Sequence, residues 1–130
     1  MRPLKILIAD DSEAFRETLK IPLSSLRNVA VVGEAADGDE AVRKSRDLKP
    51  DAVLMDVSMP VLNGLEAAKM IKEDDPSIAV LIVTAHDNAE YRSKAEAVKA
   101  DAYLLKKNLS AEPLLEAVRS CVSALRRSHH

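Results

Sequence analysis

The chain has 130 residues, of which 47% are hydrophobic and 31% are charged, and its formal net charge is −2. This length fits one domain, and the composition is typical of a soluble globular protein rather than a disordered one. The lack of a basic excess and the 2% aromatic content exclude a nucleic-acid-binding domain, and no apolar run reaches the roughly 18 residues of a membrane span. The single cysteine cannot form an internal disulfide, which fits the reducing cytoplasm that we expect for this protein.

The first predicted strand covers residues 4–9 ("LKILIA") and is followed by a predicted helix. Apolar residues of this helix recur at helical spacing, at Phe15, Leu19, Leu23 and Leu26. Ser12 or Asp11 can cap the helix by accepting hydrogen bonds from free backbone N–H groups. Pro22 lies inside the stripe, and we expect it to kink the helix or end it early, because proline lacks an N–H and clashes with the preceding turn.

Strands and helices alternate along the rest of the chain. Short runs rich in Val, Ile or Leu predict strands at residues 29–35, 52–56, 79–85 and 102–106. After each of these strands, apolar residues at helical spacing predict a helix. In chain order, the four stripes are Ala41, Val42 and Leu48; Leu65, Ala68 and Ile71; Tyr91, Ala95 and Val98; and Leu114, Val118, Cys121 and Leu125. Asn88 and Ser110 can cap the last two helices. The single cysteine, Cys121, is interpreted as a core residue.

This alternation predicts the fold class. Five strand–helix units give an α/β protein with an open, doubly wound, five-stranded parallel sheet and helices on both faces. The units are too few for a closed eight-stranded barrel. We assign residues 1–127 to this single domain and interpret residues 128–130, with their two histidines, as the remnant of a purification tag.

Reactive side chains stand at the ends of four predicted strands. Asp10 and Asp11 follow the first strand, Asp56 ends the third, Thr84 lies at the end of the fourth and Lys106 ends the fifth. Open α/β sheets bind ligands beyond the carboxyl ends of their strands, so we expect these side chains to share one crevice. Each alone has an ordinary explanation, such as a helix cap for Asp10 or Asp11. Their joint occurrence favours a site.

The chemistry of this crevice points to a metal and a phosphate. Three carboxylates repel one another, and at least one resists ionisation unless a cation is present. Oxygen ligands without His or Cys favour Mg²⁺ over zinc. With Lys106 as a second positive charge and Thr84 as a hydrogen-bond donor, the crevice suits phosphoryl transfer. Asp56 is the best candidate for a nucleophile that forms an aspartyl phosphate.

The motifs "IADDS", "LMDVSMPVLNG", "IVTAHD" and "DAYLLKK" occur in the order and spacing of one family. The chain resembles the receiver domains of two-component response regulators, across residues 3–126. The resemblance implies the flavodoxin-like strand order 2-1-3-4-5, which is known from another member of this family.

The resemblance also implies roles for single residues. Asp56 is the phosphoacceptor, and Mg²⁺ is held by Asp11 directly, by Asp10 through water, by Asp56 and by the backbone carbonyl of Ser58. Thr84 and Lys106 contact the phosphoryl oxygens, and both Thr84 and Tyr103 act as switch residues. For Tyr103 the alternative is an ordinary half-buried strand residue.

The turn after Lys106 departs from the family. Many members follow the lysine with a cis-linked proline, whereas Lys107 stands here, and a cis bond before a non-proline residue costs about 3 kcal/mol. The conformation of this turn is therefore left open, and Lys107 is an alternative phosphate contact. Ser58 and His86 stand two residues after Asp56 and Thr84, where the family tunes the access of hydrolytic water. His86 can equally be a solvated loop residue.

The implied function is a phosphorylation switch. A sensor histidine kinase or a small phosphodonor passes a phosphoryl group to Asp56, and the surface of the fourth helix, fifth strand and fifth helix is remodelled for a partner. The protein is not expected to be a turnover enzyme; it catalyses its own phosphoryl uptake and slow autodephosphorylation.

The segments "VVGEAADGDEAV" and "AYLLK" most resemble the LuxR/NarL-type branch, whose members carry a C-terminal helix-turn-helix output domain. The expected output is the control of transcription through such a domain. Formation of a homodimer on phosphorylation is compatible with this expectation. The alternatives are a stand-alone receiver acting through protein contacts, a Mg²⁺-dependent phosphohydrolase with Asp56 as nucleophile, and a phosphorylation-independent binding module. A flavin-binding protein is weaker, because no phosphate-binding loop follows the first strand.

Overall fold

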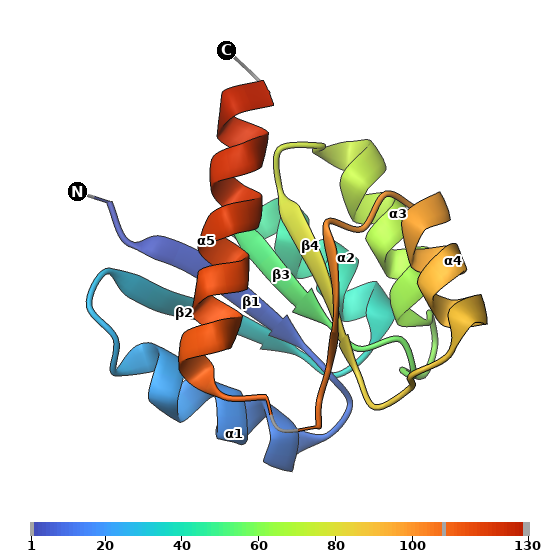
Figure 1. Cartoon of the computed structure of the whole chain (residues 1–130), viewed down its shortest axis with the longest axis horizontal. Helices are drawn as coiled ribbons and strands as arrows, with labels where there is room; N and C mark the ends of the chain where they lie inside the picture. Colours follow the sequence, from blue (N-terminus) through green and yellow to red (C-terminus); the bar gives the residue numbers. More distant parts are fainter. Residues whose placement is uncertain (1, 108, 129–130) are drawn as a thin grey trace.

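The computed structural model describes residues 2–107 and 109–128, in which strands and helices alternate (Figure 1). The elements are β1 (Leu4–Ala9), α1 (Glu13–Ser24), β2 (Val29–Ala35), α2 (Gly38–Leu48), β3 (Ala52–Met55), α3 (Gly64–Asp74), β4 (Ala79–Thr84), α4 (Ala89–Ala97), β5 (Ala102–Leu105) and α5 (Ala111–Ser128). The predicted strands are confirmed, although β3, β4 and β5 each end one residue earlier than predicted. Of the residues assigned to a tag, 129 and 130 lie outside the described residues.

All neighbouring strands are parallel, in the order β2-β1-β3-β4-β5. Both the predicted fold class and the strand order implied by the resemblance are confirmed. After β1 the chain first adds β2 on one side of it and later adds β3, β4 and β5 on the other. The switch point between β1 and β3 is where ligands of such sheets bind.

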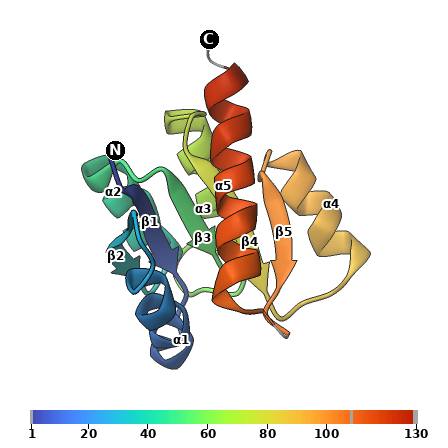
Figure 2. The ribbon, with the colours of Figure 1, turned by 60° about the vertical axis from the view of Figure 1, so that its left-hand side comes forward.

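Helices cover both faces of the sheet. Figures 1 and 2 show α5 and α1 on one face, with α3 and α4 on the other. Successive strand residues point to opposite faces, so Leu54 packs in the cluster with α1 and α5, whereas Val53 and Met55 pack in the cluster with α2, α3 and α4. Burial of each Val, Leu, Ile or Met side chain contributes about 1.5–3 kcal/mol relative to exposure. The two cores thereby hold the strand ends in fixed positions.

Pro22 lies in the last turn of α1, which ends two residues later at Ser24. The predicted early end is therefore observed, and Leu26 of the predicted stripe falls beyond the helix, where it still packs against the core on that face. The N–H of Ser25 donates to the carbonyl of Pro22 and closes the helix.

Short polar side chains cap the helices. Ser12 caps α1 and Asn88 caps α4, as predicted, and Asp37 and Asn63 cap α2 and α3 in the same way. At the start of α5, the carbonyl oxygen of Ser110 accepts a hydrogen bond from the N–H of Leu114. None of the helices within the described residues combines the length and the apolar character needed to cross a membrane.

Val61, in the loop between β3 and α3, has a φ of 69° and is 84% exposed. A β-branched residue is strained in this left-handed region, and the exposed side chain gains little from packing. We expect Val61→Asn and Val61→Gly to raise the free energy of unfolding by about 1 kcal/mol, since asparagine and glycine tolerate this conformation. Urea unfolding measures the change. Val61→Ala, which keeps a β-carbon, serves as the comparison, and equal stability of Val61→Gly and the parent chain would contradict the assignment of strain.

Candidate functional site

Three acids and one lysine meet at the switch point between β1 and β3. Carboxylate oxygens of Asp10, Asp11 and Asp56 lie within 4.8 Å of one another, with Asp10 and Asp56 buried and Asp11 exposed. The Nζ atom of Lys106 lies 2.6 Å from Oδ2 of Asp10 and 3.2 Å from Oδ2 of Asp56. The backbone N–H of Asp56 donates to the carbonyl of Ala9, which ties the two strand ends together. Five side chains were predicted to share this crevice. These four are observed together, whereas the fifth, Thr84, makes no hydrogen bond with the acids among the described residues.

Lys106 neutralises part of this acidic cluster. Burial lowers the pKa of its ammonium group, but contact with Asp10 and attraction to Asp56 outweigh burial and raise the pKa above its ordinary value of 10.5. The ring centroid of Phe15 lies 4.2 Å from Nζ, close enough for a cation–π contact. Lys106 is therefore a positioned cation at neutral pH.

The acidic cluster fits a hard divalent cation. Mg²⁺ prefers oxygen ligands, and carboxylate oxygens of Asp10, Asp11 and Asp56 lie within 4.8 Å of one another, close enough to share one ion directly or through water. Among the described residues no donor is aligned for a hydrogen bond with the buried Oδ2 of Asp10, although the ammonium of Lys106 lies beside it. The contact of this oxygen within the described residues is therefore the 2.6 Å ion pair with Lys106, a positive charge that a metal ion would replace or share.

The loop after β4 connects the other predicted residues. The hydroxyl of the buried Thr84 accepts a hydrogen bond of 3.2 Å from the N–H of His86. Nε2 of His86 lies 2.9 Å from Oγ of Ser58, and the Tyr103 hydroxyl donates to the His86 carbonyl. His86 is thus bonded to its surroundings rather than merely solvated. It contacts β4, β5 and the loop after β3.

Two glycines that the sequence analysis did not single out shape the loop after β3. A β-carbon on Gly64 would overlap with the carbonyl oxygen of Asp56, and one on Gly38 would overlap with the carbonyl oxygen of Leu62. The N-termini of α3 and α2 can approach this loop closely only because both positions lack a side chain. The one sequence signal was the presence of glycine at the start of a helix, which is also common without such a contact.

Two further residues from the sequence analysis remain: Lys107, the alternative phosphate contact, and Cys121, the expected core residue. Lys107 is exposed and makes no described contact with the acids, and no cis peptide bond occurs among the described residues. The Cys121 side chain packs against the core formed with α1 and α5, as predicted, and burial raises the pKa of its thiol. The ligand role of the Ser58 carbonyl stays a prediction.

Comparison with known proteins decides the family. The family model described as the response regulator receiver domain matches residues 6–119. The chain belongs to this family. The response regulator protein VraR of Staphylococcus saprophyticus is 40% identical over 119 residues, which are 90% of this chain and 56% of VraR. This receiver domain therefore spans about half the length of that relative.

Solved receiver domains share the fold. A LuxR-family two-component response regulator from Aurantimonas has a TM-score of 0.86 and 33% identity, covering 94% of this chain and 86% of that one. In the CheX–CheY–BeF3–Mg²⁺ complex from Borrelia burgdorferi, the corresponding values are a TM-score of 0.83, 27% identity, 92% and 89%. The family predicted from the motifs is confirmed.

Proposed function

We propose that this receiver domain is a switch that accepts a phosphoryl group on Asp56 in a Mg²⁺-dependent reaction. The observation that carries the proposal is the cluster of Asp10, Asp11 and Asp56 with the ammonium of Lys106 against two of its carboxylates. An isolated acid at the end of a strand would not account for these contacts. Instead, the nucleophile, the carboxylates that would bind a cation and the lysine that would bind phosphate lie in one cluster.

The chemistry divides among these side chains. A carboxylate oxygen of Asp56 attacks phosphorus, the bond from phosphorus to the histidine nitrogen of a kinase or to the oxygen of acetyl phosphate breaks, and the leaving group keeps the electron pair. Asp10, Asp11, Asp56 and the Ser58 carbonyl would hold Mg²⁺, which neutralises charge on the phosphoryl oxygens. Lys106 and Thr84 bind the remaining oxygens. No residue is assigned as the second acid that a phosphohydrolase with multiple turnovers would need. We therefore propose that the domain catalyses only its own phosphorylation and dephosphorylation.

The proposed signal begins at Thr84. Its hydroxyl can donate to a phosphoryl oxygen, and turning toward Asp56 would weaken the bond that it accepts from the N–H of His86. Because Tyr103 is bonded to the carbonyl of His86, the displaced loop would draw Tyr103 with it and change the surface of α4, β5 and α5. Phosphate biases this equilibrium only through the contacts it makes in one state and not in the other.

The proposed output is transcription. VraR is named a response regulator, and one solved neighbour is a DNA-binding response regulator of the LuxR family from Staphylococcus aureus, with 27% identity and a TM-score of 0.85. On this ground we assign a sensor histidine kinase in the bacterial cytoplasm as phosphodonor and a C-terminal helix-turn-helix domain as output. A homodimer on phosphorylation belongs to the same proposal.

The function is tested by incubation with acetyl phosphate. Intact-mass spectrometry is expected to show one added phosphoryl group with Mg²⁺ and none after chelation with EDTA. Borohydride reduction of the acyl phosphate, followed by peptide mapping, is expected to mark Asp56. Steady hydrolysis of p-nitrophenyl phosphate over many turnovers, without a stable adduct, would favour the phosphohydrolase instead.

Lys106→Met is expected to tighten Mg²⁺ binding by at least about tenfold while impairing phosphoryl uptake. The ammonium and a metal ion compete for the carboxylates of Asp10 and Asp56, and at an effective dielectric constant of 20 two unit charges 4 Å apart interact by about 4 kcal/mol before screening. Isothermal titration calorimetry measures the affinity. Lys107→Met carries the same charge change without these contacts, and equal tightening in both variants would contradict a local role for Lys106.

A further inference from the structure

The turn that carries Asp10 and Asp11 lies between β1 and α1 and belongs to neither element. Within the described residues, no hydrogen bond or ion pair holds the exposed side chain of Asp11. The direction of this proposed metal ligand therefore depends on its main chain. Asp56 differs, because its backbone N–H donates to the carbonyl of Ala9 and ties it directly to the end of β1.

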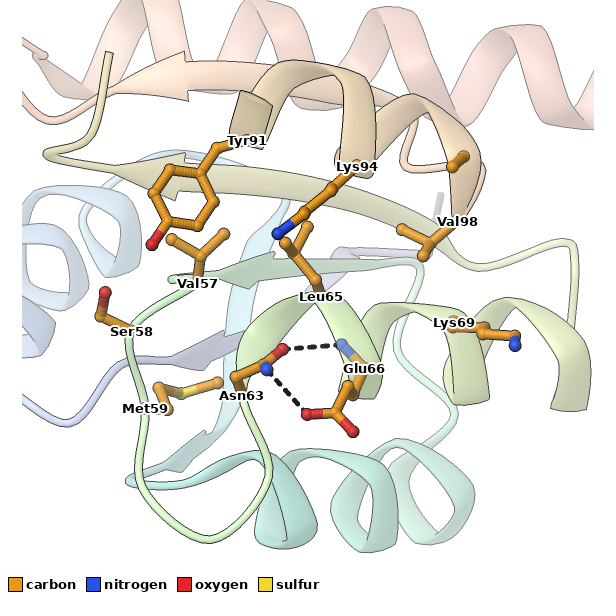
Figure 3. A pocket seen from close by; sticks show the side chains of 11 residues that line it. Val57, Ser58, Met59, Asn63, Leu65, Glu66, Lys69, Tyr91, Lys94 and Val98 are labelled. Atoms are coloured by element: carbon orange, nitrogen blue, oxygen red, sulfur yellow. Dashed lines mark hydrogen bonds between the residues drawn. The ribbon is translucent and has the colours of Figure 1, made fainter. Parts of the chain in front are cut away.

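The loop that carries Ser58 is held by the start of α3. The N–H of Gly64 donates to the carbonyl of Val57. Asn63 and Glu66 exchange two hydrogen bonds that cap the helix, and Figure 3 shows both of them below the loop. Backbone and capping bonds thus hold this side of the site without help from a charged side chain.

Arg16, near the start of α1, reaches back to the acidic turn. Its Nη1 atom donates a hydrogen bond of 2.6 Å to the carbonyl oxygen of Asp10, and its Nε atom donates one of 3.1 Å to the carboxylate of Glu34 on β2. Long side chains of a helix lean toward its N-terminus, which brings this guanidinium to the preceding turn. The side chain is 15% exposed. Because the guanidinium is rigid and planar, Glu34 sets the direction from which Arg16 approaches Asp10.

The bond from Arg16 restrains the peptide group that joins Asp10 to Asp11. A peptide group is planar, so holding its carbonyl oxygen also limits where its N–H and the α-carbon of Asp11 can lie. On the other side of Asp10, its own N–H donates to the carbonyl of Ala35 on β2 at 2.9 Å. Both peptide groups of Asp10 are thereby tied, and Asp11 leaves this fixed point toward the crevice.

Glu34 is a charged anchor for Arg16. Burial raises the pKa of its carboxyl group, but hydrogen bonds from Lys20 and Arg16 outweigh burial and lower the pKa below its ordinary value of 4.5. The ammonium of Lys20 lies 3.1 Å from the other oxygen of this carboxylate, in a more exposed contact. Of these two cations, Arg16 is the one that is also bonded to the acidic turn.

We propose that Arg16 is a positioning residue for the metal site, an inference that rests on the proposed function. It holds the peptide between Asp10 and Asp11 so that the Asp11 carboxylate stays beside those of Asp10 and Asp56. Glu34 acts through Arg16 by directing its guanidinium. Loss of a group that orients metal ligands without touching the metal typically costs about 10–100-fold in affinity. The positive charge of Arg16 by itself repels a cation, so geometry and charge predict opposite effects on Mg²⁺ binding.

Arg16→Lys separates these two effects. Lysine keeps the charge, but its single nitrogen cannot replace the two nitrogens that bind Glu34 and Asp10. Isothermal titration calorimetry of the unphosphorylated protein is expected to show an affinity for Mg²⁺ about tenfold lower than that of the parent chain. Arg43→Lys is the matched control, since Arg43 on α2 is paired with the exposed Asp39, and it should leave the affinity unchanged. Unchanged or tighter binding in Arg16→Lys, or an equal loss in Arg43→Lys, would overturn the proposal.

Glu34→Asp tests whether Glu34 acts through Arg16. The change keeps the charge but shortens the side chain by one methylene group, so the carboxylate is drawn away from the guanidinium. It should weaken Mg²⁺ binding in the parent chain and cause no further loss in the Arg16→Lys background, because both changes act on the same bond to Asp10. Additive losses would contradict this role of Glu34.

Phosphoryl uptake from acetyl phosphate distinguishes positioning of the metal from general damage to the structure. Arg16→Lys should raise the Mg²⁺ concentration needed for half-maximal uptake, while the rate at saturating Mg²⁺ stays close to that of the parent chain. A lower saturated rate with an unchanged Mg²⁺ requirement would speak against metal positioning and overturn the proposal. Urea unfolding of both variants monitors the fold.

Backbone NMR relaxation without Mg²⁺ gives a readout that needs neither metal nor phosphate. The amide of Asp11 is expected to be rigid in the parent chain and in Arg43→Lys, and to gain motion on the picosecond-to-nanosecond timescale in Arg16→Lys. Equal order parameters in all three proteins would also overturn the proposal. If the parent chain binds no Mg²⁺ and takes up no phosphoryl group, the proposed function fails, while the relaxation data still decide whether Arg16 holds the turn.

Discussion

Asp56→Asn is expected to abolish phosphoryl uptake from acetyl phosphate. The amide has nearly the shape of the carboxylate but lacks the anionic oxygen that attacks phosphorus. The fold should persist, because Asp56 shares its crevice with two other carboxylates and the loss of one negative charge reduces their repulsion. Intact-mass spectrometry in excess Mg²⁺ measures uptake, and urea unfolding monitors the fold.

Asp47→Asn is the matched control for this change. Asp47 is exposed on α2, and the same substitution there should leave uptake unchanged. Uptake by Asp56→Asn at the parent rate would contradict the assignment of the nucleophile. The chemistry of any residual label is informative, because hydroxylamine cleaves an acyl phosphate but not a phosphoserine, so a resistant label would point to a hydroxyl such as that of Ser58.

The site could be predicted from the sequence because topology does most of the positioning. Parallel strands place their carboxyl ends at one edge, so Asp10, Asp56 and Lys106 meet although they are far apart in the chain. The prediction needed only the strand ends and the types of side chain found there. Errors of one residue in the strand bounds did not matter, because each reactive side chain still lies at or just beyond the end of its strand.

The contacts that support the site could not be predicted in this way. Gly38 and Gly64 matter because two helices approach the same loop, and that approach depends on packing across the sheet rather than on local spacing. The bonds of His86 to Ser58 and Tyr103 likewise join three separate loops and strands. Periodicity and capping patterns describe one element at a time, so contacts between loops leave no comparable signal.

Lys72 is the clearest case of a residue hidden from the sequence analysis. It adjoins the apolar stripe of α3 and looks like an exposed charge, yet it is only 9% exposed. Its ammonium donates to the carbonyls of Pro76 and Ile78 and to the carboxylate of Asp101, which also accepts from the N–H of Val80. The C-terminal end of α3, the start of β4 and the start of β5 are thereby joined at the edge of the sheet opposite the acidic site.

Lys72→Met is therefore expected to lower the free energy of unfolding by about 3–5 kcal/mol, because it leaves a largely buried carboxylate without its cation. Urea unfolding followed by circular dichroism measures the loss. Lys94→Met removes an exposed lysine from a pair with Glu90 and should change stability by less than about 1 kcal/mol.

The double variant Lys72→Met/Asp101→Asn separates charge from packing. The amide that replaces the Asp101 carboxylate keeps an oxygen for the N–H of Val80 but carries no charge, so the double variant should be more stable than Lys72→Met alone. A double variant that is less stable than the single one would mean that the lysine acts through its contacts with the carbonyls and its methylene packing. In that case the ion pair with Asp101 would not be what holds these three elements together.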